Sequence, residues 1–293
     1  MKKIAIFLGL LPAFIFGNGN YTESAMLKDD IKYGVYIKVM EIPGGSFDEV
    51  CEEIETAITS SEFTMSGQWE LDTVDPHDYR SKVFVLNLRS FTNRVAELEG
   101  QRFLSVAQRI CVYEGAGRKS IIVNMTNPDA IARVYFHGTE QNVYDEFLEL
   151  SQKMKDAMLT LIQEAADGKY INEQMNPQRS EKSLNGYNGD GPAKVMAMFK
   201  DFMKSLKDIQ SKKTGDDVNE SFKASCALFE KNIEKSKEGW KIIYSIEAGQ
   251  TRRCYGISRA HTEELSTRIV GEKRDSKDDP APGIDHSPAF PIE

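Results

Sequence analysis

The stretch SFDEVCEEIETAI at residues 46–58 recurs as SFKASCALFEKNI at residues 221–233. The two segments share a serine, a phenylalanine, a cysteine, a glutamate and an isoleucine, all at an offset of 175 residues. Apolar residues in the first copy recur every three or four positions, which predicts an amphipathic helix over 47–60. Ser46, with Glu49 three residues later, is a capping box that marks the helix start. The sequence therefore predicts one kind of helix in two places.

The likeness continues beyond each helix. FTMSGQWEL at 63–71 faces WKIIYSIEA at 240–248, and LRSFTNRVAEL at 88–98 faces SRAHTEELSTR at 258–268. The order helix, strand, strand, helix is kept in both places. Chance could give any one match, but three in register favour a duplicated unit.

The first unit, residues 30–138, has the pattern of a mixed α+β domain. A β-rich run covers 33–39, and further strand-like runs cover 63–71, 82–88, 107–114 and 120–125. The glycines at 115–117 predict a β-hairpin between the last two runs. Short helices are expected at 91–99 and 128–136. We therefore expect α+β architecture with a mostly antiparallel sheet.

Residues 139–215 predict a helical insert that joins the two units. A heptad-like seam predicts a long helix over 143–165, which Gly168 terminates. Asn-Gly and Gly-Pro pairs predict a loop over 169–192, and a second amphipathic helix is expected over 195–209. The two helices are expected to form a hairpin that buries its own seam or caps a sheet. Self-association through this seam, giving a homodimer, is the alternative.

The second unit, residues 218–293, is shorter than the first. By comparison with the first unit, the chain reaches Glu293 about thirty residues before the last strands and helix would be complete. The second unit is therefore either natively abbreviated or part of a longer chain. We expect residues 271–293 to be poorly ordered.

Residues 1–19 have the features of a secretory signal peptide. Lys2 and Lys3 precede an apolar run from Ile4 to Phe16, and small residues precede a cut after Gly19. An N-terminal anchor helix is the alternative, although the run is shorter than the ~20 residues that a span requires. Loss of both lysines with the leader takes the net charge from −8 to −10. We expect a periplasmic or otherwise exported protein that is not an integral membrane protein after cleavage.

The composition narrows the function. Hydrophobic residues make up 40% of the chain, charged residues 28%, and the mean hydropathy is −0.44, as in soluble globular proteins. The acidic balance argues against nucleic acid as a partner. No Gly-rich phosphate loop, His-Glu-x-x-His or Gly-x-Ser-x-Gly motif occurs in the sequence. We therefore expect no catalytic residue.

Export would place four cysteines in an oxidising compartment. They are Cys51, Cys111, Cys226 and Cys254, and none lies in a Cys-x-x-Cys motif or near a histidine. Three full pairings are open, and so are buried free thiols and a redox or metal role. Cys51 lies on the apolar stripe of its helix, which favours a packed thiol.

Candidate metal ligands are few, and we expect no cofactor. His286 follows Asp285, and such a pair can orient an imidazole toward a metal, although a solvated histidine is the simpler interpretation. Methionines in the helical pair, Met154 and Met203 among them, are soft ligands for Cu(I), but their spacing favours core packing. Glu52, Glu53 and Glu55 are expected to be solvated.

The order of these elements resembles the domain of unknown function 302 family. The similarity rests on the first strand, the SFDEVCEEIETAI helix, VFVLNL before a short helix, and VYE before a glycine turn. It covers 33–138 and, more weakly, 218–293. The resemblance implies small α+β domains, often paired, without an established activity. That family often has Cys-Asn-Pro before its second helix. This chain has Leu-Arg-Ser at residues 88–90 and Ser-Arg-Ala at residues 258–260, so the resemblance implies no thiol role at these positions.

Two hypotheses follow. The first is a non-catalytic module that binds a small ligand or an envelope protein. The second is a periplasmic protein that uses a thiol for redox chemistry or handles copper or haem.

Overall fold

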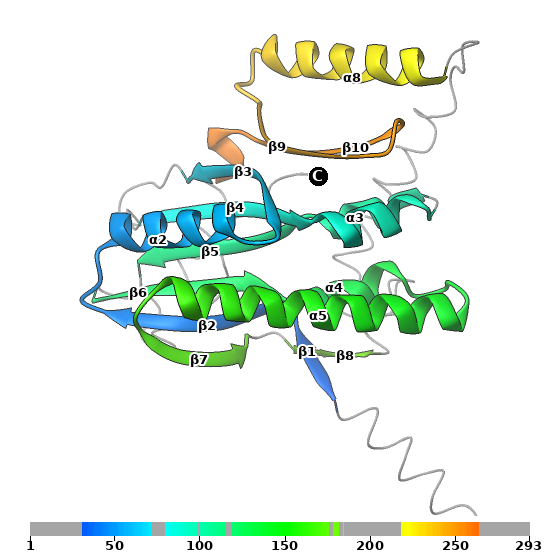
Figure 1. Cartoon of the computed structure of the whole chain (residues 1–293). Coiled ribbons are helices and arrows are strands. Elements are labelled where there is room, and N and C mark those ends of the chain that lie inside the picture. Colours follow the sequence, from blue (N-terminus) through cyan, green and yellow to red (C-terminus); the bar gives the residue numbers. More distant parts are fainter. Residues whose placement is uncertain are drawn as a thin grey trace, which may run out of the picture.

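A computed structural model describes residues 31–71, 80–98, 100–114, 119–175, 178–181, 184 and 218–263. Its main feature is a six-stranded antiparallel sheet with the strand order β3-β4-β5-β6-β2-β7 (Figure 1). The predicted α+β class is confirmed. The strands are β2 (Tyr36–Pro43), β3 (Phe63–Glu70), β4 (Ser81–Leu88), β5 (Gln108–Glu114), β6 (Ser120–Thr126) and β7 (Lys169–Gln174).

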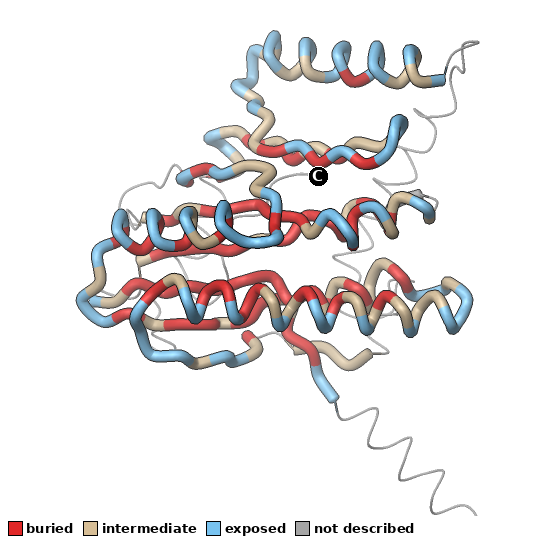
Figure 2. Tube along the Cα trace, in the orientation of Figure 1, coloured by how far each residue is buried: buried red, intermediate tan, exposed pale blue. Residues whose placement is uncertain are grey.

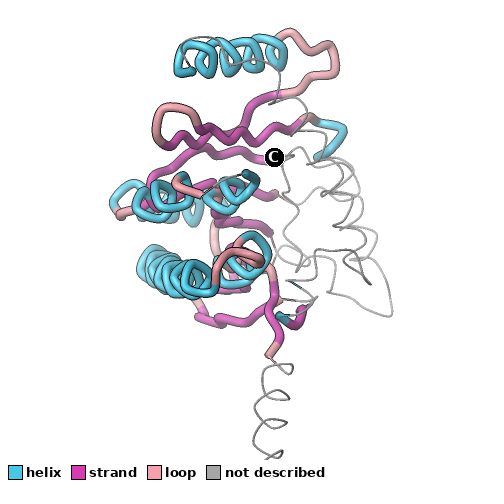
Figure 3. Tube along the Cα trace, turned by 90° about the vertical axis from the view of Figure 1, so that its right-hand side faces the viewer, coloured by secondary structure: helices cyan, strands magenta, loops and turns pink. Residues whose placement is uncertain are grey.

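Helices cover one face of this sheet (Figures 1 and 3). They are α2 (Phe47–Ser60), α3 (Arg89–Ala96), α4 (Pro128–Tyr135) and α5 (Gln141–Ala165), with a 3-10 helix, η1 (Gly100–Val106), between α3 and β5. The middle strands are almost continuously buried, as Figure 2 shows along β4, β5 and β6. Apolar residues on both faces of these strands therefore form the core.

The repeated sequence in its first copy forms α2, with the predicted bounds. Ser46 caps the helix, because its Oγ accepts a hydrogen bond from the Glu49 amide at 3.4 Å. The side chains at the predicted apolar spacing are buried, namely Phe47, Val50, Cys51, Ile54 and Ile58.

Helix α5 belongs to the core of the first unit. The Phe147 ring of α5 stacks on Phe136 with centroids 3.9 Å apart, and Phe91 meets both rings edge-on. The helix also packs against α2 and β2. The expected boundary between a first unit ending at 138 and an insert beginning at 139 therefore does not coincide with a break in the core.

The predicted loop over 169–192 was wrong for its first part. Residues 169–174 form β7, which pairs with β2, and β8 (Gln178–Ser180) pairs with β1 (Lys32–Gly34). Strand β7 lies at the sheet edge and its residues are mostly exposed, so it has no alternating apolar pattern. Asn172, at φ 50°, interrupts it further. Backbone pairing with β2, which the sequence does not display, makes this segment a strand.

The second unit begins with α8 (Val218–Glu234), β9 (Lys241–Ala248) and β10 (Arg252–Ser258), followed by helical residues 260–263. Its hairpin packs tightly against β3 at Gly67. A Cβ at Gly67 would lie 2.1 Å from the Ile243 carbonyl oxygen and 2.7 Å from the Tyr244 Cβ. Only glycine allows the two backbones to come this close.

Several expectations fall outside the described residues. These are the signal peptide, the glycine turn at 115–117, the second helix of the insert at 195–209 and the chain beyond 263. Within the described ranges, no helix is both long and apolar enough to cross a bilayer.

Candidate functional site

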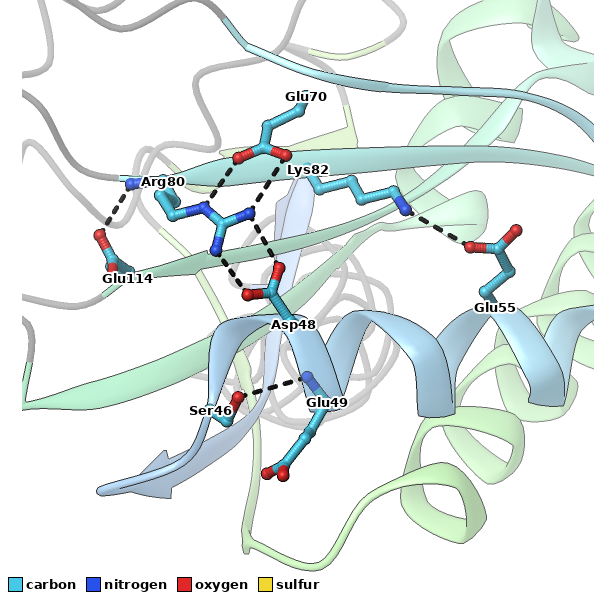
Figure 4. A network of polar contacts seen from close by, with 8 residues as sticks. All are labelled: Ser46, Asp48, Glu49, Glu55, Glu70, Arg80, Lys82 and Glu114. Atoms are coloured by element: carbon cyan, nitrogen blue, oxygen red, sulfur yellow. Dashed lines mark hydrogen bonds and ion pairs between the residues drawn. The ribbon is translucent and has the colours of Figure 1, made fainter.

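The main polar cluster of the first unit surrounds Arg80 at the start of β4 (Figure 4). The guanidinium Nε donates to Glu70 Oε1 at 2.8 Å, and Nη1 donates to Asp48 Oδ2 at 2.9 Å. The same group lies over the Phe47 ring, 4.2 Å from its centroid. The Arg80 amide donates to Glu114 at 2.8 Å. One arginine thus links the start of α2 to β3 and β5.

This arrangement keeps its charges fixed near neutral pH. The hydrogen bond from Arg80 lowers the pKa of Asp48 below its ordinary value, and the Asp48 and Glu70 carboxylates raise the pKa of Arg80. Both carboxylates therefore already neutralise a cation. Such a cluster stabilises a helix end, and the pKa shifts of Asp48 and Arg80 both favour their charged forms.

A second ion pair joins the middle of α2 to β4. Lys82 Nζ lies 3.4 Å from Glu55 Oε2, and Gln68 Nε2 donates to Glu55 Oε1 at 2.8 Å. Glu55 was expected to be solvated with its two neighbours; its side chain is 37% exposed, and it also binds Lys82 and Gln68. The strand residues that hold it are distant in sequence, so the helix pattern alone does not reveal the contact.

The second unit contains the matching pair. Arg253 Nη1 donates to Glu230 Oε1 at 2.9 Å. Glu230 is the repeat counterpart of Glu55, and Arg253 lies opposite Glu247 in the hairpin as Lys82 lies opposite Glu70. The two strands also correspond two residues further on. Lys82 lies over the ring of Phe84, and Arg253 lies over the ring of Tyr255.

A buried polar junction connects the two units. The Arg109 side chain of β5 hydrogen bonds Tyr36, and its charge also acts on Tyr244 of β9 and Cys254 of β10. Burial raises the pKa of both tyrosines, so both phenols are neutral at physiological pH. The junction therefore carries one cation among neutral groups, at the place where the hairpin meets the sheet.

All four cysteines are buried, and none of them forms a disulfide. Burial raises the pKa of Cys51 to about 12 and that of Cys254 to about 11. The thiol of Cys111 lies in the sheet, 3.4 Å from Ser81 Oγ, and Cys226 is the residue of α8 that faces the hairpin. The structure therefore places the four predicted thiols apart from any exposed site.

The weak metal candidates do not come together in the described residues. Met154 is 1% exposed in the core, while Met203, Asp285 and His286 lie outside the described ranges. Within those ranges, no group of three or more His, Cys, Asp or Glu side chains has a geometry that could hold a metal ion. Met154 therefore serves packing.

The cations that organise these clusters were not among the residues predicted from the sequence. Arg80, Lys82 and Arg253 each lie at a strand start, and Arg109 lies just before the apolar middle of β5. An alignment of the two predicted repeats could have matched Lys82 with Arg253. Each cation lies near the start of the second strand of its hairpin, opposite a glutamate near the end of the first strand. Nothing comparable marks Arg80 or Arg109.

Comparisons with known proteins show a structural likeness but no match in sequence. No family model matches this sequence, and neither does any curated protein. Among solved structures, the chain is similar to an uncharacterized conserved protein of the DUF302 group from Bacillus stearothermophilus, at 12% identity and a TM-score of 0.35. The match covers 46% of this chain and 98% of that chain.

Proposed function

We propose that this protein is an exported, non-catalytic binding module of the cell envelope. The observation that carries the proposal is the state of the four cysteines, which are the residues best suited to chemistry in this sequence. A thiolate is the form that attacks disulfides and binds soft metals. Burial of all four thiols, with the pKa of Cys51 at about 12, works against that form at neutral pH.

The charged groups support the same proposal. Arg80, Lys82 and Arg253 each bind carboxylates that join a helix to its hairpin. Their contacts favour rigidity of the helix–hairpin units, which suits a surface that recognises a partner. The ligand is a small molecule or an envelope protein.

Two measurements test the proposal. Export predicts that the protein from the periplasmic fraction begins at Asn20, as read by N-terminal sequencing. A cytoplasmic chain that retains Met1 would overturn export. Native mass spectrometry with Cu(I) or haem should show no tight uptake, whereas stoichiometric binding of either would favour the alternative, a thiol-based redox or metal-handling protein.

A further inference from the structure

The exposed apolar side chains of the described residues gather on one helix. Among the described residues, five large apolar side chains are exposed. Three of the five lie on α8, namely Val218 (53%), Leu228 (59%) and Phe229 (37%). Figure 2 shows α8 as largely exposed, apart from the turn near Cys226. A helix with exposed apolar residues and a single buried position lacks part of its packing partner.

These residues share one side of α8. Val218, Ser225, Phe229 and Asn232 recur at spacings of seven, four and three, which places them on one stripe. Ser221 and Leu228 border the stripe. We call these six residues the Phe229 flank, and none of them is charged. Phe229 packs against Tyr255 with ring centroids 4.9 Å apart, so this flank lies on the β10 side of the helix.

In the first unit, the side of α2 that corresponds to the Phe229 flank is covered by another helix. The repeat pairs Ser225 with Val50 and Phe229 with Ile54, and both residues of α2 are buried, at 3% and 0% exposure. Helix α2 packs there against α5. The two helices are antiparallel, because β7, which follows α5, starts opposite Glu41 near the beginning of α2. The exposed residue Glu53 of α2 corresponds to Leu228 in α8. The surface of α8 is therefore more apolar at this position than the surface of α2.

Among the described strands, the second unit also has no counterpart of β5. Strand β4 pairs with β3 on one edge and with β5 on the other. Its counterpart β10 pairs with β9, and among the described strands its second edge has no partner. An unpaired edge beside an apolar helix flank is a surface for strand addition.

We propose that a second copy of this chain covers this surface. By comparison with β5 and α5, the cover that the described residues do not supply is an antiparallel strand together with an antiparallel helix. A two-fold axis perpendicular to the β9–β10 hairpin generates both from the unit itself, pairing β10 with β10 and laying the two α8 helices side by side. Because the Phe229 flank is uncharged, the two α8 helices can meet along it without like-charge repulsion. The interface rests on α8 and β10, and it is independent of export and of the thiols.

Sedimentation velocity of the full chain over about 1 to 100 µM should reveal a dimer, and Leu228→Glu should weaken dimerisation by at least about tenfold. Ala227→Glu is the matched control, because it adds the same charge on the opposite side of α8 and should leave the dimer intact. Both variants place glutamate where α2 already carries one, so both should fold, which circular dichroism verifies. Ser225→Cys should form a disulfide between copies on mild oxidation, whereas Lys223→Cys should not.

Wild-type protein that stays monomeric over the whole range would overturn the proposal. A dimer that Leu228→Glu leaves unchanged would overturn it too, since the interface would then lie elsewhere.

Discussion

Lys82 of β4 and Arg253 of β10 occupy the same place in two helix–hairpin units. Each lies opposite a glutamate of the preceding strand, and each reaches a glutamate on the helix above, Glu55 or Glu230. This correspondence is what we expect if residues 46–92 and 221–262 are copies of one unit, which stays a prediction from the sequence.

Double-mutant cycles test this correspondence. The Lys82→Ala and Glu55→Ala cycle should give a favourable coupling of about 0.5 kcal/mol, as for other partly exposed ion pairs. The Arg253→Ala and Glu230→Ala cycle should give a coupling at least as large, because Tyr255 also donates to Glu230, at 2.7 Å. Urea unfolding measures both. Zero coupling in one unit and clear coupling in the other would argue against the shared design.

The close approach at Gly67 predicts a docking defect. Gly67→Ala places a Cβ against the backbone of β9 and should cost roughly 1–3 kcal/mol, as overpacking does. Hydrogen exchange should accelerate at the amides of 241–258. Thr64→Ala, at an exposed position of the same strand, is the control and should leave that exchange unchanged. Equal protection in the Gly67 variant would mean that the hairpin is held without this contact.

The aromatic cluster predicts that α5 is indispensable to the first unit. Phe147→Ala removes a fully buried ring and should destabilise the protein by about 3–5 kcal/mol. Glu149→Ala changes an exposed residue of the same helix and should lie within about 0.5 kcal/mol of wild type. Chemical denaturation with a fluorescence readout measures both. Equal stability of the two variants would mean that α5 is an insert and not part of the core of the first unit.

Arg80 predicts acid sensitivity. Because the folded pKa of Asp48 lies below its ordinary value of 3.8, this ion pair contributes stability that is fully present above pH 3.8 and is lost as the pH falls through the lowered pKa. Arg80→Ala should therefore flatten the decline of stability below pH 4. Arg89→Ala, an exposed arginine on α3, should keep the wild-type slope. Identical slopes in all three proteins would show that Arg80 does not bias Asp48.

The elements that could be predicted from the sequence are those that a local pattern specifies. The cap at Ser46 and the spacing of Phe47, Val50 and Ile54 located α2, and the apolar seam located α5. Prediction failed where pairing decides the outcome. Strand β7 is polar and forms because β2 offers an edge, and Arg80 meets Asp48 across 32 residues of sequence. Such contacts depend on register, which no local pattern displays.

Counting reactive thiols tests the central claim, that the four cysteines serve packing and not chemistry. With a chromogenic disulfide reagent and no added reductant, native protein should release no colour within minutes, and denatured protein should show four thiols. A native thiol that reacts as fast as in the denatured chain, or fewer than four thiols after denaturation, would contradict the account.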